Sequence, residues 1–161
     1  MAHEEHLKAK IIESNNRLGI DLQKSTSPSG NFLDEVISAA IKEIRVGEER
    51  NAAYWAYQMH ISHPAAARFL WECYRVCADE DCGLANPQAL GVVTERMRLY
   101  YDLPEKDPRR GFVVTFVTIY LARSPKSRFV NEIHMDLVQR IENGFTLEMP
   151  DRAIDMHTKR G

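Results

Sequence analysis

Apolar residues recur three and four positions apart along most of this chain, which is the pattern of helices that bury one face. Such stretches cover about residues 31–45, 48–60, 63–80, 87–101 and 125–143, with glycine, proline, serine or asparagine near their ends. We expect a helix over each of them. The positions expected to face the core are Leu33, Val36, Ile37, Ala40, Ile41 and Ile44; Ala52, Trp55, Ala56 and Met59; Ala66, Phe69, Leu70, Cys73 and Cys77; Leu90, Val93, Met97 and Tyr100; and Phe129, Val130, Ile133, Leu137, Val138 and Ile141.

The segment from Gly111 to Arg123 has a different pattern. Its run FVVTFVT is rich in β-branched and aromatic residues, which favour strands. The run does not alternate cleanly and has no partner strand elsewhere, so we expect a helix that is buried on most sides. Residues 3–18 predict a mostly polar helix that ends at Gly19, and KSTSPSG predicts a turn-rich linker. The fold class is therefore all-α: an N-terminal helix and linker (1–30), a compact multi-helix domain (31–144) and an extended basic tail (145–161).

The stretch DEDCGLANPQAL, residues 79–90, predicts a tight corner between two helices. Gly83 suits the left-handed conformation in which many helices end. Asn86 can cap the next helix and Pro87 fits its first position. The acids at 79–81 are unfavourable at a helix C-terminus, so they must be solvated, paired with a basic neighbour, or functional.

Composition and charge limit the classes of function that we expect for this protein. The chain has 161 residues, 44% hydrophobic and 27% charged, which indicates one soluble domain. The net charge of −2 gives no general attraction to nucleic acid or membranes. Three cysteines within ten positions are a poor disulfide framework and favour a reducing cytoplasm. The polar N-terminus lacks a signal-peptide core, and no apolar run is long enough to span a bilayer. No P-loop is present, so we expect no ATP hydrolysis by this chain alone.

Catalytic and metal sites receive little support from the sequence. Cys73, Cys77 and Cys82, with His60 and His63 upstream, lack the second distant pair that zinc sites use. Cys73 and Cys77 fall on an apolar stripe, where free cysteines act as small core residues.

Other titratable residues fit structural roles. Asp79 and Asp81 could act as acid and base, although a solvated helix end explains them equally well. His134 lies on an apolar stripe and is expected in the core. We expect no catalytic residue, metal or cofactor; the alternative is a small metal- or cysteine-dependent enzyme that uses the three cysteines.

Two sets of residues are candidates for contacts with partners. The basic set could touch DNA phosphates or a protein if it clusters in space. It comprises Arg109, Arg110, Arg123, Lys126, Arg128, Lys159 and Arg160. The aromatic set exceeds what one buried stripe per helix can hide and predicts an oligomer interface. It comprises Tyr54, Tyr57, Trp71, Tyr74 and Tyr101.

An ordered series of motifs resembles the C-terminal region of the RarA/MgsA replication-associated recombination ATPases, which are AAA+ proteins related to clamp loaders. The motifs are FLDEVISAAIKEIR, NAAYWAYQM, DEDCGLANPQAL, IYLARSPKS and DMHTKRG, and the likeness covers roughly Leu22 to Gly161.

The resemblance implies an all-helical domain like the collar of clamp-loader subunits, assembled as a homotetramer. It also implies work at stalled replication forks in DNA repair and recombination. The implied partners are DNA, single-strand-binding protein or an AAA+ ATPase.

This sequence departs from the family in two ways. The ATPase core has no counterpart in it, and Cys82 stands before the corner glycine where the family usually has isoleucine. The chain is either an excised domain or a free-standing homologue, and its native-looking start favours the second.

Overall fold

The computed structural model describes residues 17–161, so the helix expected over 3–18 lies almost entirely outside the described part. Residues 17–161 contain α-helices and no β-strand, which confirms the all-α class. The α-helices are α2 (Leu33–Val46), α3 (Glu49–Ser62), α4 (Pro64–Val76), α5 (Ala89–Asp102), α6 (Arg109–Arg123) and α7 (Phe129–Glu142).

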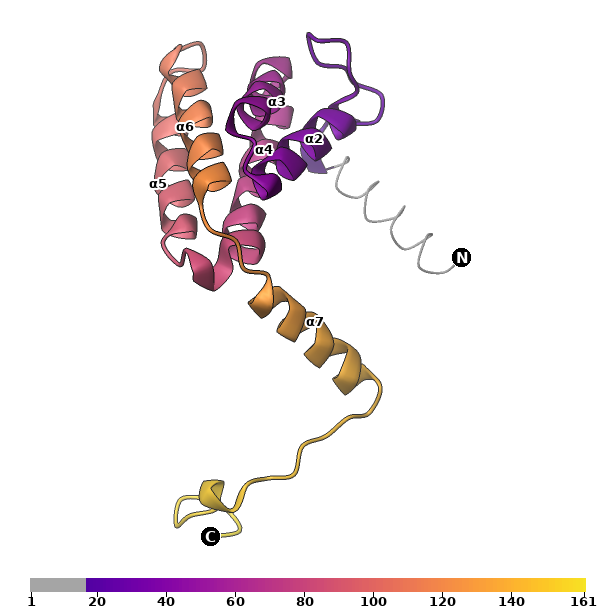
Figure 1. The fold of residues 1–161 in the computed structure, drawn as a ribbon, viewed down its shortest axis with the longest axis vertical. Coiled ribbons are helices and arrows are strands. Elements are labelled where there is room, and N and C mark those ends of the chain that lie inside the picture. Colours follow the sequence, from indigo (N-terminus) through magenta and orange to yellow (C-terminus); the bar gives the residue numbers. More distant parts are fainter. Residues whose placement is uncertain (1–16) are drawn as a thin grey trace.

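Helices α2 to α6 form a packed body (Figure 1). Helix α3 packs against α2, α4 and α6, and its fully buried Ala52 and Ala56 let these neighbours approach closely. Helix α4 contributes Trp71 and Tyr74 to the centre of the core, where the Tyr74 hydroxyl is hydrogen-bonded to Thr118 of α6. These large side chains join the helices into one core.

The predicted helix ends agree approximately with those in the structure. Gly47 ends α2 with φ of 82°, in the left-handed conformation that glycine adopts without strain. Pro64 occupies the first turn of α4, where its missing N–H costs little. His63 caps α4, because its Nδ1 accepts the Ala65 N–H at 3.0 Å.

The corner after α4 differs from its prediction. A π-helical turn (Cys77–Cys82) and a 3-10 turn (Gly83–Ala85) follow α4. Gly83 has the expected positive φ, 48°, but its ψ of −131° lies outside the left-handed helical region. Asn86 does not cap α5 and Pro87 does not occupy its first turn, because α5 begins at Ala89. The side-chain amide of Asn86 instead donates to Tyr120 Oη at 3.0 Å and Ser124 Oγ at 2.9 Å.

Helix α6 confirms that the FVVTFVT segment is helical. Val113, Val114 and Val117 are buried against the body. Phe112 and Phe116 are 69% and 36% exposed, so α6 is buried on one side only and keeps an apolar outer face.

The predicted burial is wrong throughout helix α7, and also for Leu90 of α5, which is 38% exposed. Helix α7 leaves the body after α6 and points away from it, followed by the tail (Figure 1). Its expected core residues are all exposed, as is His134, which we expected in the core. The stripe of apolar residues is present, but no surface within residues 17–161 covers it.

Candidate interaction surfaces

Residues 124–128, which lead from α6 into α7 and are called here the root of α7, are held by a buried carboxylate. Asp81, in the π-helical turn, is 2% exposed. Its Oδ2 accepts from Arg45 Nε at 2.9 Å and its Oδ1 accepts from Arg128 Nη1. The hydrogen bond to Asp81 raises the pKa of Arg45. A buried carboxylate needs such partners, because desolvation of an unpaired charge is costly.

The acidic cluster at the corner thus has two different explanations. Asp81 is the paired acid, whereas Asp79 and Glu80 are exposed to solvent. The backbone carbonyl of Asp81 also accepts the Ser127 N–H at 2.8 Å. One residue therefore ties α2, the corner and the segment that leads into α7.

Lys126 fixes the same segment from the other side. Its ammonium donates to the carbonyl oxygens of Leu121 at 2.7 Å and Ala122 at 3.2 Å, and to that of Ser124. Cations are favourable at a helix C-terminus, where carbonyl groups lack partners. Lys126 therefore caps α6 and sets the course of the chain into α7.

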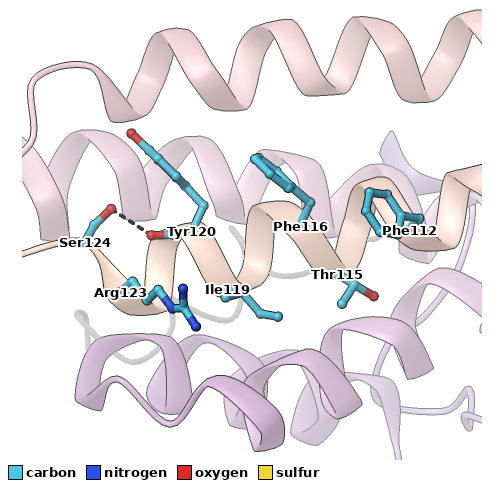
Figure 2. A pocket seen from close by; sticks show the side chains of 7 residues that line it. All are labelled: Phe112, Thr115, Phe116, Ile119, Tyr120, Arg123 and Ser124. Atoms are coloured by element: carbon cyan, nitrogen blue, oxygen red, sulfur yellow. Dashed lines mark hydrogen bonds between the residues drawn. The ribbon is translucent and has the colours of Figure 1, made fainter.

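An apolar groove runs along the outer face of α6. It has a volume of about 600 Å³, and its lining residues are Phe112, Thr115, Phe116, Ile119, Tyr120, Arg123 and Ser124. Figure 2 shows Phe116 and Tyr120 on one side of the α6 ribbon and Ile119 and Arg123 on the other. The Arg96 guanidinium lies 4.0 Å from the centre of the Phe116 ring.

The aromatic set divides into surface and core residues. Tyr54, Tyr57 and Tyr101 are 50%, 44% and 47% exposed and stay candidates for an interface. Trp71 and Tyr74 are 1% and 0% exposed, so their assignment to an exposed interface is wrong. Both residues lie off the stripe that contains Phe69 and Cys73. They are buried nevertheless, because α4 has neighbours on several sides and buries more than one stripe.

Most of the basic set contacts groups of the chain itself. Arg109 pairs with Asp107 at 2.6 Å, which lowers the pKa of Asp107 to about 2, and Arg123 pairs with Glu49 at 2.6 Å. Arg110 donates to the carbonyl of Leu103 at 2.7 Å.

The remaining basic residues lie at two places. Lys126 and Arg128 hold the root of α7 through their bonds to the end of α6 and to Asp81. Lys159 and Arg160 are exposed on the tail. The structure therefore does not gather the seven residues into one patch.

The cysteines and nearby histidines do not form a cluster. Among residues 17–161 no three His, Cys, Asp or Glu side chains are grouped as metal ligands. Cys77 and Cys82 are buried and Cys73 is partly buried, and all three are free thiols. Burial raises the pKa of the Cys73 thiol to about 12 and raises that of Cys77 as well. Thiols with raised pKa values are poor nucleophiles and poor metal ligands at neutral pH.

Two features of these surfaces were not expected from the sequence. The pairing of Asp81 with Arg45 and Arg128 joins residues 36 and 47 positions apart, and no local pattern indicates it. The α6 groove had a signal: Phe112, Phe116 and Tyr120 recur every four residues and form an apolar face of their own.

The fold and these surfaces define a class: a helical domain with exposed apolar faces and no nucleotide-binding motif in its sequence. Residues 47–161 match the family model described as the C-terminal region of MgsA AAA+ ATPases. The match covers more than half of the chain, so the chain belongs to this family, and the resemblance seen in its motifs is confirmed.

The chain is accordingly an AAA+ ATPase-associated helical domain. No curated protein sequence matches it. No helix within residues 17–161 combines the length and apolar character required to cross a membrane.

Proposed function

We propose that this chain is a non-catalytic oligomerisation and interaction module that acts in DNA replication, recombination or repair. The observation that carries the proposal is the uncovered apolar stripe of α7, which includes Ile133, Leu137 and Ile141 at 44%, 45% and 64% exposure. An exposed stripe of large apolar residues along one helix is typical of an interaction site. The family membership supports an association with AAA+ ATPases.

Self-association is the first part of the proposal, with a homotetramer as the expected assembly. Closed homo-oligomers are the commonest soluble assemblies, and aromatic residues such as Tyr54, Tyr57 and Tyr101 are enriched in interfaces. Nucleotide is not required, because the contact surfaces lie outside any ATPase core.

Light scattering on the purified chain tests self-association. At micromolar concentration and without nucleotide, we expect the mass of a homo-oligomer and, most specifically, four times the chain mass of 18.5 kDa. The mass of a dimer or trimer would support self-association but would replace the expected tetramer with another symmetry. A mass of one chain would contradict the proposal.

The partners belong to the second part of the proposal. DNA, single-strand-binding protein or a partner AAA+ ATPase would be held by the assembled module. Lys159 and Arg160 are exposed on the tail, and we expect these charges to contact such a partner. The alternative of a cysteine- or metal-dependent enzyme is disfavoured by the burial of Cys77 and Cys82.

A further inference from the structure

We propose that α7 of one copy docks in the α6 groove of a second copy, and that the two copies exchange their helices reciprocally. This inference rests on the proposed self-association and specifies which two surfaces meet. The name "arm" stands for α7, Phe129–Glu142, and the name "groove" for the apolar face of α6 around Phe112 and Phe116.

The arm needs a partner for physical reasons. It has 14 residues, and none of them is buried. Isolated helices of this length are marginal in water even when every residue favours helix. Its apolar stripe begins at Phe129, 61% exposed, and ends at Ile141, 64% exposed. Packing of that stripe is what would stabilise the helix.

The groove matches the arm in chemistry and in length. The groove is mainly apolar and shallow, with Phe112 69% exposed at one end and Arg123 at the other. At 1.5 Å per helical residue, the axis from Phe112 to Arg123 is roughly 17 Å long and the arm stripe from Phe129 to Ile141 is roughly 18 Å long. Two helices of equal length can therefore pack along their full extent.

The charges of the two surfaces are complementary. From Arg109 to Arg123, α6 carries three arginines and no acidic residue. Glu49 and Asp107 neutralise two of these arginines, and the third, Arg110, is bonded to the Leu103 carbonyl. The cation at the edge of the groove is therefore Arg96, beside Phe116.

The arm carries more acidic than basic residues. It has Glu132, Asp136 and Glu142 against Arg140, which pairs with Asp136 at 2.9 Å. Its remaining carboxylates, Glu132 and Glu142, can meet the basic edge of the groove, whereas pairing of two arms would oppose like charges.

The root of the arm directs it toward another copy. Only residues 124–128 separate α6 from α7, and Ser127 and Arg128 are both bonded to Asp81. Lys126 is bonded to the last carbonyls of α6. With this short segment fixed, α7 points away from its own body (Figure 1). Since every chain has both surfaces, each pair of copies can form two identical contacts, as a closed symmetric interface requires. This exchange closes at two copies, so the proposed tetramer would join two such pairs through another face.

Two substitutions separate the arm from the groove. Leu137→Glu places a charge on the apolar stripe of the arm, and Phe116→Glu places one in the groove. Both side chains are exposed, 45% and 36%, so neither change should unfold the body. Gln139→Glu is the matched control, because helical periodicity puts residue 139 on the face of α7 opposite Leu137. Thermal unfolding followed by circular dichroism verifies that each variant folds. We expect the helices of the body to unfold at the same temperature in the variants as in the wild type.

Light scattering at about 10 µM chain gives the readout, because an interface charge is expected to raise the dissociation constant at least about tenfold. We expect Leu137→Glu and Phe116→Glu each to lose mass, while Gln139→Glu keeps the wild-type mass. A one-to-one mixture of the two variants should then assemble in pairs, because one intact arm meets one intact groove.

The outcomes separate this inference from the proposed function. A wild-type oligomer that survives both substitutions overturns the docking and leaves self-association standing. Loss of mass with Leu137→Glu alone shows that the arm docks elsewhere, on another arm or another face, and also overturns it. A monomeric wild type, with the arm closed on its own groove or free, overturns both.

Discussion

At the scale of single residues, Gly83 and Asp81 have different structural roles in the corner between α4 and α5. Gly83 has a φ of 48°, and a Cβ at this position would lie 2.9 Å from the backbone oxygen of Ser127. The chain can therefore turn there, and the segment before α7 can approach, only if no side chain intervenes. Asp81, two residues earlier, supplies the charge that holds the approaching segment.

Substitution of Gly83 should destabilise the domain. Gly83→Ala should lower the free energy of unfolding by more than about 1 kcal/mol, since backbone strain is joined by the contact with Ser127, and Gly83→Val should lower it further. Urea unfolding at one fixed chain concentration measures the effect.

Gly91 offers the control for this change. It lies inside α5 with no atom near its missing Cβ, so Gly91→Ala should stabilise the domain by about 0.5–1 kcal/mol. Equal stability of wild type and Gly83→Val would show that the backbone at Gly83 is not constrained.

At the scale of elements, α7 is an amphipathic helix whose apolar face is not covered by any other part of residues 17–161. Its position depends on the bonds at its root and not on packing along its length. Helix α6 has the reverse arrangement, because one face is packed in the body and the other is open. Within one copy, the direction of α7 should therefore be sensitive to changes at Asp81.

Asp81→Asn should release the root of α7. The change keeps the size of the side chain and removes the charge that Arg45 and Arg128 share, so we expect a loss of about 2 kcal/mol, moderated by the partial exposure of both arginines. Trypsin should also cleave faster after Lys126 and Arg128, since both side chains lie in the released segment.

Asp136→Asn is the matched control for the root. It removes an exposed pair with Arg140 on α7, which is worth about 0.5 kcal/mol or less. Unaltered cleavage and stability in Asp81→Asn would mean that the ion pairs do not position the helix.

At the scale of the whole molecule, charge and assembly are the properties to consider. The net charge is −2, and most of the basic residues that could reach DNA already contact carboxylates or carbonyls of the chain. Any nucleic-acid contact of the assembled module should therefore depend on exposed charges outside these pairs, among which Lys159 and Arg160 are prominent.

The proposed DNA binding has a defined salt dependence. If Lys159 and Arg160 touch phosphates, affinity for gapped duplex should fall steeply with added salt, and Lys159→Glu with Arg160→Glu should reduce the slope of log K against log salt by about 2. Arg109→Glu with Arg123→Glu is the charge-matched control and should have the smaller effect. Fluorescence anisotropy over a salt series measures both, and salt-independent binding would assign the tail charges to plain surface.

The sequence by itself determined the helices and the family of this protein. The three-four spacing, Gly47 and Pro64 determine local structure, because capping and periodicity act over a few residues. Only the tertiary structure decided which apolar faces are covered. Trp71 and Tyr74 are in the core while Leu137 and Ile141 face solvent, although all four lie on helices with apolar faces. The same holds for Asp81, whose partners come from distant positions. Burial and pairing depend on which segments meet in space, and the local pattern that forms each helix does not encode that.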